Sequence, residues 1–111
     1  MNTKTHIKTI DINFPISGTK IKIPFNMICS VTNKKFTGFV IIEYCPNKKA
    51  VEFVDIENFI NITSKNKLTA EKFAHIIFET IKANIRPQYL KVLIDIIKSD
   101  AHQPAQVWIE K

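Results

Sequence analysis

The sequence predicts an α+β fold in which an antiparallel sheet carries helices on one face. Apolar residues alternate with polar ones in the first half of the chain and again near its end, which is typical of half-buried strands. Between these regions apolar residues recur every three or four positions, as in amphipathic helices. An order of strands, helices and strands, without an internal repeat, favours a sheet covered on one side.

The first half of the chain predicts strands. Residues 4–14 alternate loosely and predict the first one. From Lys20 the alternation is clean, and one face carries Ile21, Ile23, Phe25, Met27 and Cys29. Pro24 interrupts this segment and indicates an edge position, because proline cannot donate a ladder hydrogen bond. After a polar turn at 32–35, the next strand places Phe36, Gly38, Val40, Ile42 and Tyr44 on its core face.

A turn at 46–49 leads into a short segment at 50–54, which predicts a strand paired as an antiparallel hairpin with the one before it. The apolar period then changes, and a short helix is expected over residues 55–62. A second helix begins after Thr69, a plausible N-cap, and should end near Ile85 because Pro87 follows. Alternation resumes at Leu90–Ile96 and again at Ala105–Ile109, which predicts the last two strands.

The length, composition and net charge of the chain limit the class of protein to which it can belong. A chain of 111 residues fits one domain, 1–111, rather than two. No apolar run approaches the ~18 residues of a membrane span, and the first residues form no apolar leader, so a cytoplasmic protein without a membrane partner is expected. Two cysteines in that compartment should stay reduced. The formal net charge of +6 fits either a polyanionic partner such as RNA or a lysine-rich solubilising surface.

Two side chains are candidates for chemistry, and each has an ordinary structural role as its competing interpretation. Cys29 could be a small buried residue, or a nucleophile whose pKa is lowered by Lys34 and Lys35. Glu71 falls at the second position of its helix, where the helix dipole favours an ionised carboxylate. It could simply stabilise the helix start, or accept two N–H donors from a guanine-type edge.

Several classes of site are not expected. His6, His75 and His102 are scattered, so the histidines and cysteines have no spacing typical of a zinc site, and no metal is predicted. The chain has only two glycines, Gly18 and Gly38, which leaves no glycine-rich phosphate loop.

The run from Cys29 to Val92 resembles the QueF-type nitrile reductases of queuosine biosynthesis, which act on 7-cyano-7-deazaguanine. The family signature reads Cys-Pro-x-Thr-Gly-x-x-Asp-Phe and is followed by a strand, Tyr-x-Pro and Val-Glu; this chain matches it in part, at the same spacing and without a gap. Nineteen residues after Glu52, Ala70-Glu71 stands where the family has His-Glu, and a later Pro-x-Tyr-x-x-Val is also present. The matching positions are Cys29, Thr32, Tyr44, Pro46, Val51, Glu52, Glu71, Pro87, Tyr89 and Val92.

The resemblance implies the tunnelling fold (T-fold), a four-stranded antiparallel sheet with two helices, assembled as a homo-oligomeric ring with pockets between subunits. It implies that Cys29 attacks the nitrile to form a thioimide. Glu71 would grip the deazaguanine edge, and Val51 and Glu52 would line the same site. Cys29, Glu52 and Glu71 are therefore expected to meet in one pocket.

The departures from the family pattern select a branch of it. Phe36 stands where the family has an acid–base aspartate, and Ala70 where it has a histidine. The Arg-Gly-Gly segment associated with NADPH binding has no counterpart between Ser99 and Val107. These features favour the short branch that uses ammonia to form an amidine on transfer RNA, as in archaeosine formation. NADPH would be a cofactor only if the chain were instead a reductase. A non-catalytic purine- or pterin-binding relative and an unrelated domain whose basic face binds RNA are also compatible with the sequence.

Overall fold

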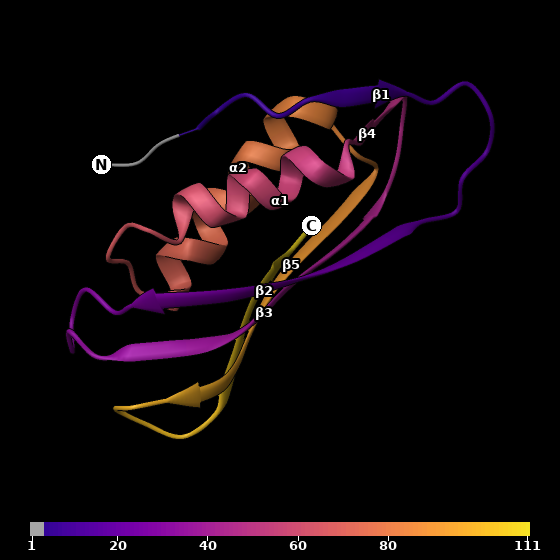
Figure 1. The fold of residues 1–111 in the computed structure, drawn as a ribbon. Coiled ribbons are helices and arrows are strands. Elements are labelled where there is room, and N and C mark those ends of the chain that lie inside the picture. Colours follow the sequence, from indigo (N-terminus) through magenta and orange to yellow (C-terminus); the bar gives the residue numbers. More distant parts are fainter. Residues whose placement is uncertain (1–3) are drawn as a thin grey trace.

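The structure, a computed structural model, describes residues 4–111. Its main element is a four-stranded antiparallel sheet in the order β2-β3-β5-β6, with both helices on one face (Figure 1). This confirms the predicted four-stranded antiparallel sheet and its two helices. The strands are β2 (Thr19–Ile28), β3 (Lys35–Cys45), β5 (Tyr89–Ser99) and β6 (Ala105–Glu110).

β2 is an edge strand, as the proline predicted, because Pro24 is exposed and β2 pairs only with β3 within this sheet. The hairpin pairs Thr19 with Tyr44 at one end and Ile28 with Lys35 at the other. Alternation places Ile23, Phe25 and Met27 in the core.

β3 and β5 form the centre of the sheet, and their register shifts between Thr37 and Gly38. A Cβ atom at Gly38 would lie 1.8 Å from the backbone oxygen of Asp95. Glycine is therefore required here by the close approach of the two strands, which is one of the uses of glycine inside a strand.

The chain leaves the main sheet at Pro46, and β4 (Lys49–Val51) pairs with β1 (Thr9–Asp11) in a separate two-stranded sheet. The predicted hairpin between 36–44 and 50–54 is therefore wrong. Of the strand predicted over residues 4–14, only the three residues of β1 are observed, because the backbone before β1 forms hydrogen bonds with side chains and not with another strand. Asp55 accepts from Lys8 N (2.7 Å), and Asn84 Oδ1 accepts from Ile7 N (3.2 Å).

The helices are α1 (Phe53–Thr63) and α2 (Ala70–Ile85). α1 begins two residues before the predicted start because the Glu52 carboxylate accepts a hydrogen bond from Val54 N (2.6 Å) and caps it. α2 begins after Thr69, whose hydroxyl accepts from Lys72 N (3.1 Å), and ends at a left-handed Arg86 (φ 45°). Both ends of α2 were predicted correctly.

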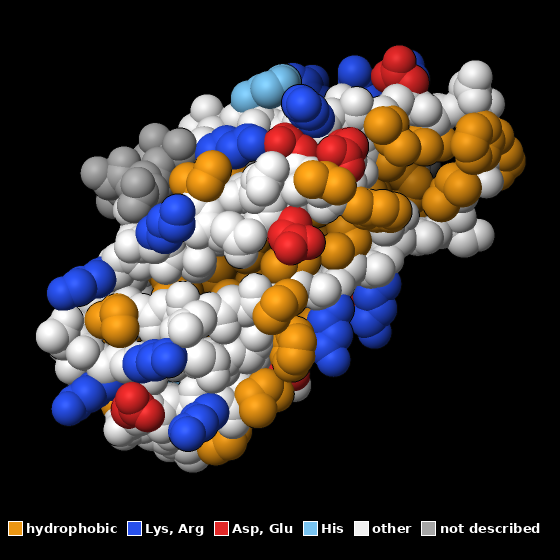
Figure 2. Space-filling view, viewed as in Figure 1, with side chains coloured by type: hydrophobic (Ala, Val, Ile, Leu, Met, Phe, Trp, Pro, Cys, Tyr) orange, Lys and Arg blue, Asp and Glu red, His pale blue; other side chains and the backbone are white. Residues whose placement is uncertain are grey.

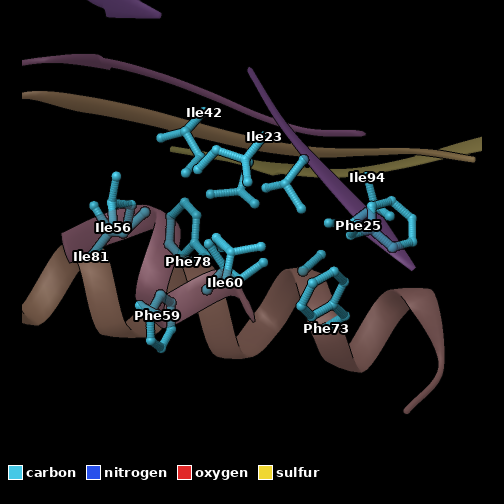
Figure 3. Close-up of a cluster of buried hydrophobic side chains, with 14 of the residues drawn as sticks. Ile23, Phe25, Ile42, Ile56, Phe59, Ile60, Phe73, Phe78, Ile81 and Ile94 are labelled. Atoms are coloured by element: carbon cyan, nitrogen blue, oxygen red, sulfur yellow. The ribbon is translucent and has the colours of Figure 1, made fainter. Parts of the chain in front are cut away.

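The core lies between the helices and the sheet (Figure 3). The sheet contributes large apolar side chains, among them Ile23, Phe25, Ile42 and Ile94. These face the apolar sides of the helices, with Phe73, Phe78 and Ile81 on α2 and Ile56, Phe59 and Ile60 on α1. Phe25 makes edge-to-face contacts with Phe36 and Phe73, at centroid distances of 5.6 and 5.5 Å. This packing fixes the start of α2 against the end of β2, where the candidate site lies.

Candidate functional site

Cys29 follows the last residue of β2 and opens a tight turn. Its N–H donates to Lys34 O (3.0 Å), while its carbonyl accepts from Asn33 N (2.9 Å). Asn33 adopts a left-handed conformation (φ 57°), which closes the turn. The backbone therefore holds the thiol at the junction of sheet and turn.

The same turn also affects the pKa of the thiol. The backbone N–H of Thr32, and more weakly that of Val31 and the Thr32 hydroxyl, hold the pKa of Cys29 below its ordinary value. Burial and the negative charge of Glu71 act in the opposite direction. The expected helpers, Lys34 and Lys35, are not among the causes, so hydrogen bonding to the thiolate replaces the predicted lysine potential.

Glu71 is the second residue of α2, as predicted, and its side chain is exposed. It lies in the first helical turn, whose unpaired N–H groups carry partial positive charge.

Cys29 and Glu71 line one cavity of about 280 Å³, called the Cys29 pocket here. Its volume is close to the lower end of the ~300–1,000 Å³ typical of small-molecule sites. Phe36 and Ala70, where the resemblance expects an aspartate and a histidine, are also in the wall. The polar lining residues are Cys29, Thr32, Thr69, Glu71 and His102, and the apolar ones are Val31, Phe36, Ala70, Ile96, Ala105 and Val107.

His102 is the lining residue that sequence reasoning missed. It lies between β5 and β6, seventy-three residues from Cys29, and no spacing motif joins the two. The antiparallel pairing of β3 with β5 brings this turn beside the start of β3. The pairing Phe36–Ser99 is the feature that could have located it.

Within one chain, Val51 and Glu52 do not line the Cys29 pocket. The expected meeting of Cys29, Glu52 and Glu71 in one pocket therefore stays a prediction for a site between subunits. Val51 N donates to Tyr44 Oη (3.1 Å) at the far end of β3, and Glu52 caps α1. Tyr44 lies eight residues along β3 from Phe36, which is about 27 Å at ~3.4 Å per residue.

A larger cavity of about 430 Å³ lies at that far end, lined in part by Cys45, Lys20 and Glu43. There the Cys45 thiol donates to Gln88 Oε1 (3.6 Å), and Lys20 pairs with Glu43 (3.2 Å). Both cysteines are free thiols, as predicted. Because backbone N–H groups lower the pKa of the Cys29 thiol, the smaller cavity is the better chemical candidate.

The charge distribution of the surface and the grouping of the remaining side chains bear on which kinds of site the described residues could form. On the face viewed in Figure 2, basic side chains are spread out with acidic ones among them, and hydrophobic side chains gather near the β1–β2 connection. Within residues 4–111, no three His, Cys, Asp or Glu side chains are grouped so that they could hold a metal ion. No helix in the described part of the chain is long and apolar enough to cross a membrane.

Comparison with known proteins shows which sequences and which solved structure this chain resembles. No family model matches the chain. It is 26% identical over 77 residues to the NADPH-dependent 7-cyano-7-deazaguanine reductase of Sulfurimonas denitrificans, covering 68% of this chain and 62% of the relative. It is 30% identical over 78 residues to the protein of that name from Campylobacter jejuni, covering 68% and 61%. The chain thus spans less than two thirds of these relatives.

Among solved structures, a crystal structure of the archaeosine synthase QueF-Like in the apo form superposes with a TM-score of 0.76. The match covers 87% of this chain and 95% of that one, at 18% sequence identity. At this identity the likeness concerns the fold, and it agrees with the four-stranded sheet and two helices described above.

Proposed function

We propose that this chain, a relative of the QueF-type 7-cyano-7-deazaguanine reductases with the fold of a QueF-like archaeosine synthase, acts on the nitrile of a 7-deazaguanine base. One observation carries the proposal. Cys29 and Glu71, forty-two residues apart, line the same cavity, and the thiol there has a lowered pKa.

The two groups have complementary roles in this proposal. The Glu71 carboxylate accepts two N–H donors from the edge of the deazaguanine, which fixes the ring by charge-assisted hydrogen bonds. The Cys29 sulfur attacks the nitrile carbon and forms a thioimide. The apolar wall, including Phe36 and Ile96, offers the ring a surface from which water is excluded.

Amidine formation on transfer RNA is the preferred outcome for the thioimide. Ammonia adds to the thioimide carbon, and the thiol then leaves to give the amidine and regenerate Cys29. The formal charge of +6 supports a polyanionic substrate. Neither lysine nor arginine lines the Cys29 pocket, so its residues fit the phosphates of NADPH poorly.

Two further candidate functions each have an observation in their favour. The sequence relatives are named as NADPH-dependent reductases, which favours reduction of the nitrile. Loss of NADPH absorbance on adding 7-cyano-7-deazaguanine would support that activity. Phe36 and Ala70 in the pocket wall favour a purine- or pterin-binding protein without catalysis.

Intact-mass spectrometry tests the central step. Incubation with 7-cyano-7-deazaguanine should add one ligand mass to the wild type and to Cys45→Ala, and none to Cys29→Ala. Glu71→Gln should weaken binding about 10- to 100-fold, because hydrogen bonds to a charged group contribute ~1.5–3 kcal/mol. Glu79→Gln, on an exposed position of the same helix, is its control.

The outcomes separate the candidates. Absence of an adduct together with saturable binding that is lost in Glu71→Gln would favour the binding protein. Absence of both would reject the proposed function. Transfer-RNA binding that falls steeply with salt and ignores both substitutions would favour an RNA-binding domain.

In this proposal, Val51 and Glu52 would line the site from a second copy of the chain. Because Val51 contacts Tyr44 at the end of β3 opposite to Phe36 and neither Val51 nor Glu52 lines the Cys29 pocket, they would line the same site only in a homo-oligomer with pockets between subunits. Co-expressed Cys29→Ala and Glu52→Gln chains should then recover part of the activity that each lacks alone. A protein that is fully active as a monomer would contradict this arrangement.

A further inference from the structure

The turn between β5 and β6 brings an imidazole to the wall of the Cys29 pocket. His102 lies in this turn, which Ser99 organises: its Oγ accepts from the backbone N–H groups of Ala101 (3.1 Å) and His102 (3.3 Å). His102 Nδ1 lies 2.6 Å from Gln103 O. Three local interactions therefore fix the backbone and the ring.

The contact with Gln103 also selects a tautomer. A carbonyl oxygen can only accept a hydrogen bond, so His102 Nδ1 must carry the proton that joins them. In the neutral ring this leaves the lone pair on Nε2. The ring is thus prepared to take up a proton at Nε2 and to release it again.

The other polar groups of the pocket wall are less suited to that task. The hydroxyl of Thr69 accepts from Lys72 N, and that of Thr32 accepts from Lys34 N, in both cases as part of a turn or cap. Hydroxyls are also poor bases near neutral pH. Of the residues that line this pocket, His102 has the side chain of the type that most often serves as a general acid and base.

We propose that His102 is the proton-transfer partner of Cys29 in this pocket. The inference rests on the proposed function for its substrate. In the step it assists, a bond forms between Cys29 Sγ and the nitrile carbon, and one π bond of the C≡N group breaks. That electron pair moves to nitrogen, which receives the thiol proton through His102 Nε2. The product is a neutral thioimide, and no oxidant or reductant is consumed.

Two features of the pocket agree with this pairing. N–H groups of Thr32 and Val31 stabilise the thiolate once the proton has left it. Glu71 opposes the thiolate, but its negative charge in the same cavity would attract the positive charge that His102 carries while it holds the thiol proton. An imidazole that alternates between neutral and protonated forms therefore suits this mixture of charges.

The rate of adduct formation tests the pairing. His102→Gln should slow the gain of mass on 7-cyano-7-deazaguanine about 10²-fold, the lower end for loss of a general acid–base group. Affinity for the nitrile-free 7-deazaguanine base should stay within about threefold, because Glu71 remains. His6→Gln removes another exposed imidazole and should react at the wild-type rate. An unchanged rate in His102→Gln would overturn the inference.

A second probe separates this inference from the proposed function. Iodoacetamide alkylates Cys29 without a nitrile, and peptide mass distinguishes it from Cys45. If His102 accepts the thiol proton, His102→Gln should slow this alkylation about tenfold, equivalent to one unit in the thiol pKa. If the wild type forms no nitrile adduct, the proposed function fails, and the alkylation rate alone then tests the role of His102. Slower alkylation of His102→Gln would support proton transfer between Cys29 and His102, and an equal rate would reject it.

Discussion

Gly38→Ala should destabilise the protein by about 3–5 kcal/mol. The added Cβ would lie 1.8 Å from Asp95 O, 2.9 Å from Asp95 C and 3.0 Å from Ile97 N, whereas nonbonded carbon atoms settle at ~3.5–4.0 Å. All three neighbours are backbone atoms of a central strand, so no side chain can turn away. Overpacking costs ~1–3 kcal/mol, and separating the strands would lose about two hydrogen bonds at ~1 kcal/mol each.

Urea unfolding followed by circular dichroism measures this loss, with Gly18→Ala as the matched control. A Cβ at Gly18 would lie 3.5 Å from Tyr44 O, which is ordinary contact, and neither glycine has a positive φ. The control should therefore change stability by less than about 1 kcal/mol. A Gly38→Ala variant that loses less than about 1 kcal/mol would refute the reasoning, because the strands could then part without cost. Ile96, which faces Gly38 across the pair, lines the Cys29 pocket, so ligand affinity should fall as well.

Three further changes test the folded state. Asp55→Asn should cost about 1–3 kcal/mol near neutral pH, because the buried carboxylate accepts from Lys4 Nζ (2.6 Å) and Lys8 N (2.7 Å). The Lys4 hydrogen bond, and next that of Lys8, lower the pKa of Asp55, so its stabilisation is present above about pH 3.9 and disappears as the pH falls through the folded pKa. Wild type and Asp55→Asn should converge in acid unfolding curves, and a constant gap down to about pH 2 would contradict this. Tyr44→Phe removes the hydroxyl that accepts from the backbone of β4 (3.1 Å) and should cost about 1–3 kcal/mol in urea, an expectation that fails if the unfolding midpoint is unchanged. Thr69→Ala removes the cap of α2 and should cost about 1 kcal/mol, with most of it restored by Thr69→Ser; equal stability of the two variants would argue against the cap.

The elements that sequence predicted well are those whose local chemistry agrees with their packing. The second helix has a capping threonine before it, an apolar stripe along it and Pro87 after it, and it runs as expected from Ala70 to Ile85. The edge position of β2 followed from Pro24, because a proline removes the hydrogen-bond donor that an inner strand needs. In these segments no distant contact competes with the local preference.

The errors arose where distant contacts decide the structure. Nothing near residues 49–51 indicates that they pair with residues 9–11 rather than with the preceding strand. Likewise, Asp55 and Asn84 draw the first described residues away from a strand through hydrogen bonds that span 47 and 77 positions. Local alternation has the same appearance in both outcomes, so periodicity could not distinguish them.

For the candidate site as well, local patterns predicted some features and distant contacts decided the others. The positions of Cys29 at a strand end and Glu71 at a helix start were predictable from local patterns, but their meeting in one cavity followed only from the family resemblance. Glu52 matches the family equally well and yet lies at the other end of the chain's sheet, where it caps α1. A matching motif therefore identifies residue types, while the topology decides which of them share a pocket.

The three pocket residues to which we assign roles, Cys29, Glu71 and His102, come from three different elements: a strand end, a helix start and a turn between strands. The backbone of each is fixed by its own hydrogen bonds, so removing one side chain leaves the other two in place. Substitution of Glu71 should then reduce affinity, substitution of Cys29 should abolish the adduct, and substitution of His102 should reduce only its rate. If Glu71→Gln and His102→Gln act on binding and proton transfer separately, their effects on the observed rate at low ligand concentration should multiply. A double variant no slower than the worse single one would mean that both residues serve one function, namely ligand positioning.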